Sequence, residues 1–287
     1  TIEQMAKVKA VVPETVFPHG YAVLNADDDL VFAMKESLKC NVALFSMDEN
    51  NPRIIEHSKK GGYAAVFENG YITIMKGTWK IRVIRVAEVP ITYGGKALHN
   101  VMNCLPAVLS TYFWRNIAIE DIKLALQTFV PSASQTPGRL NMFQFKHFKF
   151  LVDFAHNPAG LELLCDFVSK MDGEPKVGII SGTGDRRDED IKDLGRISAK
   201  CFDEIIIRQD KNLRGRTAEE IVNLLVEGLN ETKAKDIPIT IIYNEKEAIM
   251  HAYNTAKQGS LVTIMCDVVA EALDLIKALK EKEDMEG

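Results

Sequence analysis

The sequence lacks several features that would assign it at once to a broad class. No apolar run approaches the roughly 20 residues of a membrane-spanning helix, and no signal peptide is visible. Its five cysteines form no CxxC pair and no metal-ligand spacing, so neither a disulfide framework nor a zinc site is expected. A Gly-x-x-x-x-Gly-Lys-Ser/Thr phosphate loop is also absent, so these 287 residues do not themselves supply that element.

The bulk composition is that of a globular protein, with 46% hydrophobic and 26% charged residues. A net charge of -5 gives no reason to expect a nucleic-acid partner or an anionic membrane surface. Most of the cysteines lie in apolar stretches, so we expect buried free thiols and a cytoplasmic, reducing compartment. The chain begins at Thr1 in what already reads as a helix, which suggests a fragment that starts inside a domain.

Hydrophobic periodicity predicts an α/β fold. At 287 residues the chain is long enough to form two hydrophobic cores. Residues 21–24 and 42–45 read as strands. Residues 63–67, 71–75 and 80–86 read as antiparallel strands, because Asn69-Gly70 is a hairpin turn signal. A long helix over 98–114 is expected to be interrupted at Pro106, and another helix covers 119–129.

A loop rich in Pro, Ser and Gly over 131–138 marks the expected domain boundary. Beyond it, strands alternate with helices, which predicts a parallel, doubly wound sheet. The expected strands are 140–146, 149–153, 177–181, 204–208, 239–242 and 261–265.

The most informative segment is Val152-Asp153-Phe154-Ala155-His156-Asn157-Pro158. A buried strand ends in an acid, and a helix follows with Asn157 as N-cap and Pro158 at its first position. The carboxylate and imidazole therefore fall at the carboxyl end of a strand, where open α/β sheets bind ligands. An ordinary capped turn with solvated polar side chains explains the same pattern.

Two further loops are expected at the carboxyl ends of neighbouring strands. The first, residues 181–188, combines Gly182 and Gly184 with an Asp-Arg-Arg-Asp run. It suits an anionic ligand held by backbone N–H groups and forked guanidinium donors. The second, residues 208–216, places four cations and an acid before a helix with a Thr217/Glu220 capping box, which suits a substrate that carries carboxylates. Internally paired or solvated charges remain the alternative for both loops.

In the first half of the chain, Asn100 and Asn103 share one face of the predicted helix over 98–114. Two amides on one face can recognise a purine edge through paired donor and acceptor contacts, although helix capping accounts for them equally well. Arg139 follows the loop between the two halves, where it can reach a phosphate or bond to backbone carbonyls.

These motifs, in this order, resemble the Mur ligase superfamily of ATP-dependent amide-forming ligases, which includes folylpolyglutamate synthetase. The resemblance rests on residues 24–28, His99-Asn100-x-x-Asn103, Pro137-Gly138-Arg139 and Asp153-x-Ala155-His156-Asn157-Pro158. Within the superfamily the sequence is most similar to the Mur-ligase-like half of the cyanophycin synthetase family. That similarity rests on residues 7–12, on Gly182-x-Gly184-Asp185-Arg186-Arg187-Asp188-Glu189-Asp190 and on Asp210-Lys211-x-Leu213-Arg214-Gly215-Arg216.

The resemblance implies that residues 1–136 form the later part of a P-loop-type central ATPase domain that lacks its phosphate loop. Residues 137–287 would form a complete, Rossmann-like Mur ligase C-terminal domain. ATP would phosphorylate a carboxylate, and an amine would attack the acyl phosphate to give an amide. In the cyanophycin synthetase family, this half would join arginine to the aspartate side chains of a polyaspartate acceptor.

The resemblance also assigns roles to particular residues. ATP contacts fall on Asn100, Asn103, Arg139, Asp153, His156 and Asn157. Contacts to the amino acid or the polymer fall on Asp185, Arg186, Arg187, Asp210, Asn212, Arg214 and Arg216. The phosphate loop and the magnesium ligands would lie upstream, so no catalytic or metal-binding residue is assigned here. We therefore expect no ligase activity from this chain alone.

Other functions remain open on the sequence. The chain could be a non-catalytic Mur-like module that binds nucleotide or polymer, or a Mur or folylpolyglutamate-type ligase with another amino-acid specificity. A nicotinamide-binding Rossmann unit fits poorly, because Gly-x-Gly-Asp-Arg-Arg lacks the third glycine and the acid about 20 residues further on. The sequence leaves the oligomeric state open.

Overall fold

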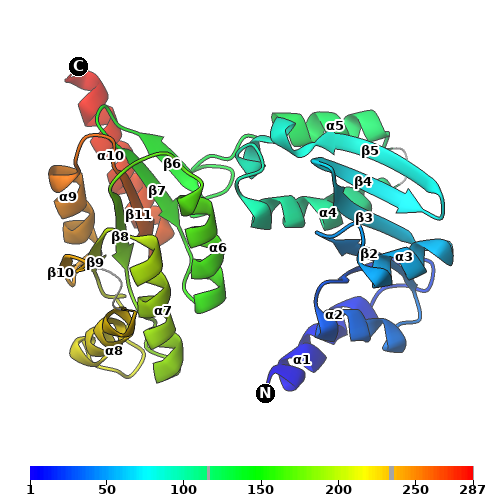
Figure 1. Cartoon of the computed structure of the whole chain (residues 1–287), viewed down its shortest axis with the longest axis horizontal. Coiled ribbons are helices and arrows are strands. Elements are labelled where there is room, and N and C mark those ends of the chain that lie inside the picture. Colours follow the sequence, from blue (N-terminus) through cyan, green and yellow to red (C-terminus); the bar gives the residue numbers. More distant parts are fainter. Residues whose placement is uncertain (115–116, 233–235, 287) are drawn as a thin grey trace. The chain divides into compact units, whose positions relative to one another are not determined.

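The computed structural model describes residues 1–114, 117–232 and 236–286. Internal contacts divide it into two units, Thr1–Val130 and Pro131–Gly287 (Figure 1). The loop predicted as the boundary therefore packs with the second unit. The assignment of residues 1–136 to an ATPase domain and of 137–287 to a C-terminal ligase domain stays a prediction. Within the described ranges, no helix has the length and apolarity needed to cross a membrane.

The first unit is built on a five-stranded mixed sheet in the order β1-β2-β3-β4-β5. Strands β1 to β3 are parallel, whereas β3, β4 and β5 are antiparallel, as the hairpin signal predicted. Asn69 and Gly70 adopt positive φ angles of 50° and 81°, which suit a tight hairpin turn. The strands are β1 (Tyr21–Asn25), β2 (Asn41–Ser46), β3 (Tyr63–Glu68), β4 (Tyr71–Lys76) and β5 (Trp79–Arg85).

Helices cover both faces of this sheet. On one face, Val101 and Leu105 of α4 pack on strand residues such as Ala65. On the other face, Ile54 of α3 packs on strand residues such as Leu44. The helices are α1 (Ile2–Glu14), α2 (Asp29–Ala33), α3 (Pro52–Lys59), α4 (Leu98–Tyr112) and α5 (Ile119–Thr128). Short 3-10 turns are η1 (Met34–Ser37), η2 (Val86–Glu88) and η3 (Pro90–Thr92).

The predicted interruption of α4 at Pro106 is wrong, because the helix continues through the proline. A proline inside a helix removes one backbone hydrogen bond and crowds the preceding turn. Here the buried face of α4, which includes Val101, Leu105, Val108 and Leu109, packs into the sheet on either side of Pro106. That burial offsets the local cost and keeps the helix whole.

The second unit is a six-stranded sheet in the order β10-β9-β8-β11-β7-β6. All its strand pairs are parallel except β6 with β7. The strands are β6 (Asn141–Gln144), β7 (Lys149–Asp153), β8 (Lys176–Ile180), β9 (Glu204–Ile207), β10 (Ile239–Ile241) and β11 (Leu261–Met265). The helices are α6 (Pro158–Ser169), α7 (Asp188–Cys201), α8 (Ala218–Glu231), α9 (Glu245–Thr255) and α10 (Val269–Met285).

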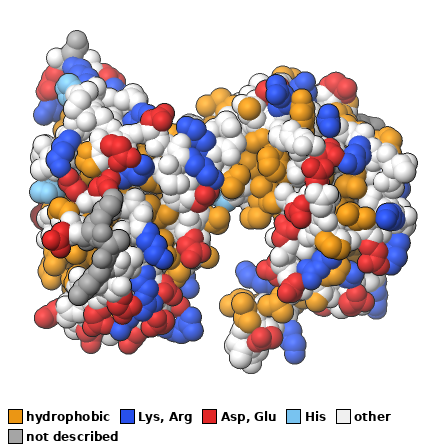
Figure 2. Space-filling view, viewed as in Figure 1, with side chains coloured by type: hydrophobic (Ala, Val, Ile, Leu, Met, Phe, Trp, Pro, Cys, Tyr) orange, Lys and Arg blue, Asp and Glu red, His pale blue; other side chains and the backbone are white. Residues whose placement is uncertain are grey.

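Helices again lie on both faces, so the predicted doubly wound α/β fold is confirmed. Helices α6, α7 and α8 cover one side, and α9 and α10 cover the other (Figure 1). Ile249 of α9 and Ile276 of α10 pack with alternate residues of β11, Val262 and Ile264, which is the period of two expected for a strand. In Figure 2, acidic and basic side chains mingle over α7 and α8, where Arg196 pairs with Glu231 at 2.6 Å.

The strand order corrects one prediction about the loops. The turn after β7 was expected to lie beside the loop after β8, but β11 separates these two strands. Sequence order gave no hint of this, because β11 is the last strand of the chain and takes its place through long-range pairing.

The cysteines also differ from expectation, which had most of them buried. Only Cys104 and Cys266 are buried, whereas Cys40, Cys165 and Cys201 are partly exposed. Cys165 lies on α6 and Cys201 on α7, and both line a cavity beside these helices.

Candidate functional site

Asp153 ends β7 with its carboxylate fixed by the backbone. Its Oδ2 accepts the N–H of Leu140 at 3.0 Å and its Oδ1 accepts the N–H of Ala155 at 2.9 Å. Burial raises the pKa of Asp153, although these backbone hydrogen bonds and the cation of Arg139 oppose the shift. The helix that follows begins as predicted, with the Asn157 side chain accepting the N–H of Gly160 at 2.8 Å.

The Phe154 ring in this turn lies against two of the predicted site residues, Arg139 and His156. The Arg139 guanidinium lies over the Phe154 ring, 5.5 Å from its centroid. The His156 ring lies 5.0 Å from the Phe154 ring, and its Nδ1 is 3.0 Å from the Phe154 carbonyl oxygen. Three of the residues expected to contact ATP, Arg139, His156 and Asn157, therefore lie close to Asp153 at the end of β7.

Asn141 organises the neighbouring Pro-Gly-Arg loop, a role that sequence reasoning missed. It is only 3% exposed. Its Oδ1 accepts the N–H of Gly138 at 2.7 Å, and its Nδ2 donates to the Thr136 carbonyl at 2.9 Å. Gly138 has a φ of +68°, and a Cβ there would lie 2.8 Å from the side chain of Val269. No motif marked Asn141, because a strand residue with a structural amide looks like any polar strand residue.

The loops after β8 and β9 are joined by their charged side chains. Arg214 pairs with Asp185 at 2.7 Å. Arg216 donates through Nε to the Gly184 carbonyl and through Nη2 to the Arg186 carbonyl, each at 2.9 Å. The prediction that these loops lie together is therefore confirmed.

Close packing also explains the two glycines of the first loop. A Cβ on Gly184 would lie 1.9 Å from the Leu213 carbonyl oxygen, and one on Gly182 would lie 2.8 Å from Ile221. The structure thus gives these glycines a packing role between the loops. Contact of their N–H groups with an anion stays a prediction.

The predicted substrate-binding residues differ in whether their side chains already have partners within the protein. Arg187 pairs with Asp190 at 2.6 Å, in the first turn of α7. The Asn212 side chain accepts the N–H of Arg214 at 2.9 Å, which supports the left-handed φ of 50° at Arg214. Arg186 is partly buried, and among the described residues no side-chain partner is recorded for it. Its contact with an anionic ligand stays a prediction.

Arg208 is the centre of a buried charge network behind the loop after β9. It is 1% exposed. Its Nη1 lies 2.5 Å from Asp210 Oδ1 and its Nε lies 3.2 Å from Glu245 Oε2. Its Nη2 donates to the Met265 carbonyl at the end of β11. This guanidinium therefore links the ends of β9 and β11 to the start of α9.

A cavity of about 420 Å³ lies in front of this network. Four of its lining residues are acidic and two are lysines, namely Asp210, Glu245, Asp267 and Glu271 with Lys211 and Lys246. Burial raises the pKa of Glu245, and the Arg208 cation opposes that shift. Sequence reasoning missed Glu245, Asp267 and Glu271. An acid two residues after the final strand was the available signal for Asp267.

The first unit holds a separate apolar groove of about 330 Å³ beside Asn100 and Asn103. The Asn100 Nδ2 donates to the Ile91 carbonyl at 2.9 Å, and no bond to its Oδ1 is recorded from the part of the chain that the structure describes. Asn103 is exposed, and among the described residues no partner is recorded for its side chain. Apolar residues of α4 and α5 form the walls: Cys104, Ala107, Val108, Ile122, Ala125, Leu126 and Phe129.

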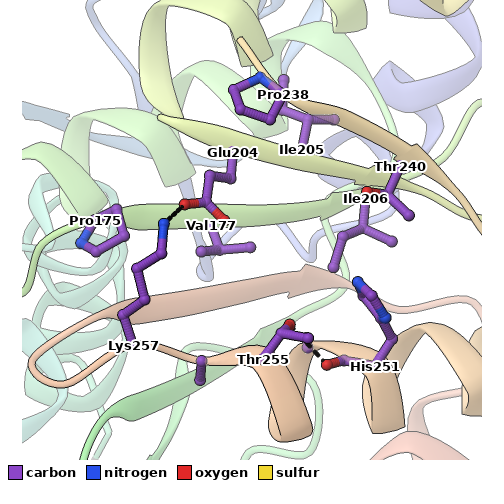
Figure 3. Close-up of a pocket in the computed structure, with 12 residues that line it drawn as sticks. Pro175, Val177, Glu204, Ile205, Ile206, Pro238, Thr240, His251, Thr255 and Lys257 are labelled. Atoms are coloured by element: carbon purple, nitrogen blue, oxygen red, sulfur yellow. Dashed lines mark hydrogen bonds and ion pairs between the residues drawn. The ribbon is translucent and has the colours of Figure 1, made fainter.

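A small cavity lies at the amino-terminal ends of β8, β9 and β10, beside the end of α9. The cavity there holds about 40 Å³, little more than a few water molecules (Figure 3). Lys257 pairs with Glu204 across it, and Thr255 bonds to the His251 carbonyl. This space is too small for an amino acid, whereas the cavity of about 420 Å³ lies at the carboxyl ends of β9 and β11, where α/β sheets bind ligands.

Comparison with known proteins agrees with these features. Residues 138–267 match the family described as Mur ligase, glutamate ligase domain. The chain is 43% identical to the cyanophycin synthetase of Synechocystis sp. over 98% of its own length and 32% of that protein. It is 45% identical to the cyanophycin synthetase of Crocosphaera subtropica over 96% of its length and 31% of that protein. The chain thus spans about a third of these relatives.

Solved structures show the same fold. The folylpolyglutamate synthase of Mycobacterium tuberculosis, complexed with ADP and AMPPCP, aligns with a TM-score of 0.65. The alignment covers 96% of this chain and 59% of that protein, at 18% identity.

Proposed function

This chain belongs to the Mur ligase superfamily, and from that premise we propose that it is part of an ATP-dependent ligase that forms amide bonds. Its matched domain and its similarity to cyanophycin synthetases over nearly its whole length support the proposal. The observation that carries it is the cavity of about 420 Å³ at the carboxyl ends of β9 and β11, bounded by the loop that pairs with the β8 loop. Such a cavity suits the amino-acid substrate of a ligase.

The proposed reaction couples ATP to a carboxylate. The γ-phosphoryl group passes to a carboxylate oxygen, and ADP leaves. The amine of the second substrate then attacks the acyl carbon, and phosphate leaves as the amide forms. The charge that develops on the acyl oxygens needs fixed cationic or N–H donors.

The residues of this chain would bind and position the substrates. In the first unit, the apolar groove would hold the adenine ring, with the Asn103 amide and the Asn100 oxygen reading its edge. In the second unit, Arg139 would contact phosphate oxygens, and Asp153 with His156 and Asn157 would contact the ribose region. Arg186 would face the anionic reacting group.

No magnesium ligand is assigned to a residue of this chain. Among the described residues, no group of three or more His, Cys, Asp or Glu side chains could hold a metal ion. The binding of magnesium by a longer protein that contains this chain stays a prediction.

For the amine substrate we propose arginine, added to aspartate side chains of a polyaspartate acceptor, as the similarity to cyanophycin synthetases implies. The cavity lining supports a cationic amino acid, because its four carboxylates outnumber its two lysines. The Arg208 guanidinium already neutralises part of that charge from behind. Asp267 Oδ2 accepts the backbone N–H of Lys211 at 2.9 Å. Among the described residues, no other hydrogen bond to this carboxylate is recorded.

The deciding experiment is an amino-acid screen that follows phosphate release from ATP. The whole protein that contains this chain is supplied with a polyaspartate-based acceptor and each amino acid in turn. Arginine is expected to give release well above the other amino acids, and Arg186→Gln is expected to raise the KM for a substrate without unfolding the protein. Lys170→Gln, at the residue that follows α6, is the matched charge control.

The outcomes separate the candidate functions. Release with another amino acid would leave the ligase proposal intact and replace the substrate. No release with any amino acid would favour a non-catalytic module that binds nucleotide or polymer. Arginine incorporation by residues 1–287 alone would contradict the expectation that this chain is inactive by itself.

A further inference from the structure

Two cysteines of the second unit face each other outside the proposed ligand site. Cys165 lies on α6 and Cys201 is the last residue of α7. The two helices pack side by side (Figure 1). Both cysteines line one cavity, and a side-chain hydrogen bond from Cys165 raises the pKa of Cys201.

The pair opens onto solvent. Both residues are partly exposed, and both line a cavity of about 490 Å³ together with Ser169, Lys176 and Lys200. A small disulfide-containing molecule can therefore approach the pair through this cavity. The cavity lies near the carboxyl-terminal ends of α6 and α7, whereas the proposed ligand loops precede their amino-terminal ends.

The other three cysteines lack this arrangement. Cys104 and Cys266 are buried, and burial raises their pKa values to about 11 and about 12. Cys40 is partly exposed but belongs to the first unit. Among the described cysteines, only Cys165 and Cys201 share both a side-chain hydrogen bond and a cavity.

We propose that Cys165 and Cys201 are a modification site, a dithiol that closes to a reversible disulfide by exchange with low-molecular-weight disulfides such as oxidised glutathione. Because the two side chains line one cavity on helices that pack side by side, closure is expected to need side-chain rotation and little backbone movement. The bond would cross-link the end of α6 to the end of α7.

The chemistry balances in two exchange steps. One protein thiolate attacks a sulfur of oxidised glutathione, which forms a mixed disulfide and releases one glutathione thiolate. The second protein thiolate attacks the protein sulfur of that mixed disulfide and expels the second glutathione. The two protein thiols lose two electrons and two protons, and oxidised glutathione is reduced to two thiols.

The neighbouring thiol and burial raise the pKa of Cys201. Only the thiolate is a nucleophile, so the exchange is expected to be slow near neutral pH and to accelerate as the pH rises. This rate dependence accompanies the proposal but does not establish it.

The test equilibrates the purified 287-residue chain with defined ratios of reduced to oxidised glutathione under anaerobic conditions. Acid quenching, alkylation with iodoacetamide and digestion without reduction are followed by mass spectrometry. We expect a linked peptide pair that contains Cys165 and Cys201, two hydrogen atoms lighter than the separate peptides. Its formation should reverse with excess reduced glutathione, and the thermal midpoint of the second unit should rise when the link is present.

Three variants sharpen the result. Cys40→Ser is expected to form the same link. Cys165→Ser and Cys201→Ser are expected to stop at a glutathione mixed disulfide on the remaining thiol. The proposal is overturned if both wild-type thiols are alkylated even in a large excess of oxidised glutathione, if exchange stops at mixed disulfides, or if the link joins another cysteine. The wild-type and Cys40→Ser results decide the question even if a serine variant in the pair does not fold.

Discussion

Arg208 Nη1 lies 2.5 Å from Asp210 Oδ1, in a pair whose side chains are 2% and 9% exposed. Both residues follow β9, and the Ser181 hydroxyl donates to the same Asp210 oxygen at 3.1 Å from the end of β8. This contact joins the two strands at their carboxyl ends. The floor of the proposed amino-acid cavity therefore depends on one buried guanidinium.

Replacement of that guanidinium is expected to destabilise the second unit. Arg208→Met leaves two carboxylates, Asp210 and Glu245, without their buried cation, and such a loss costs about 3–5 kcal/mol. Urea denaturation followed by far-UV circular dichroism measures it, since both tryptophans, Trp79 and Trp114, lie in the first unit. Arg187→Met, on the exposed surface of the same unit, is the control. Equal midpoints for the two variants would contradict the structural role of Arg208.

The pH dependence of stability tests the environment of Glu245. Burial raises its pKa above the ordinary value of 4.5. A raised pKa in the folded state means that the folded protein holds the proton more tightly, so this contribution to stability is present at low pH. It is lost as the pH rises from about 4.5 through the folded-state pKa.

The expected signature is a difference curve between the wild-type protein and Glu245→Gln. The unfolding free energy of the wild type should fall relative to the variant as the pH rises above about 4.5 and then level off. Denaturation at several pH values between pH 4 and pH 8, about the range that spans this titration, supplies the curve. The same change at the exposed Glu247 on the same helix is the control. A difference that grows in the opposite direction would show that the pKa of Glu245 is lowered.

Gly184 is expected to tolerate no side chain. A Cβ there would lie 1.9 Å from the Leu213 carbonyl oxygen, so Gly184→Ala must push the β8 and β9 loops apart. Overpacking of this kind costs about 3 kcal/mol and should break the Arg214–Asp185 pair. Gly215→Ala is the comparison, because its φ of +92° brings strain of about 1 kcal/mol without any atom within 4 Å of the new Cβ. A smaller loss for Gly184→Ala than for Gly215→Ala would contradict this account.

The sequence predicted the elements of the second unit well because each carries a local signal. The strands are apolar and short, Asn157 and Pro158 start α6, and the Thr217/Glu220 capping box starts α8 with both of its hydrogen bonds. The order of the strands has no such signal. Placement of β11 between β8 and β7 depends on pairing between segments more than 80 residues apart in sequence, and periodicity carries no information about that.

The candidate site divides in the same way. The residues that follow strands were found from local patterns, but the partners of charged side chains depend on three-dimensional proximity. Nothing local pairs Arg214 with Asp185, because the two residues lie 29 positions apart in the sequence. The buried state of Arg208 was equally hidden, because an arginine that ends a strand is usually solvated.

Adenosine binding to the first unit is the most direct test of the nucleotide assignment. The groove of about 330 Å³ has apolar walls and two amides at its edge, a combination that suits a flat base with polar edge atoms. Asn103→Ala removes one potential hydrogen bond of about 1 kcal/mol, so the affinity for adenosine should fall about three- to tenfold. Isothermal titration calorimetry on the 287-residue chain measures this change.

Gln127→Ala provides the matched control for that measurement. Gln127 lies on α5 next to the groove residue Leu126, but its amide donates to Glu88 at 3.0 Å. It should leave the affinity unchanged, whereas a bulky change in the groove, Ala107→Phe, should abolish binding by filling the space for the base. Adenosine that binds equally well to wild type and Ala107→Phe would place the nucleotide elsewhere. Loss of the adenine assignment would leave the amino-acid cavity of the second unit as a separate proposal, since the two sites share no residue.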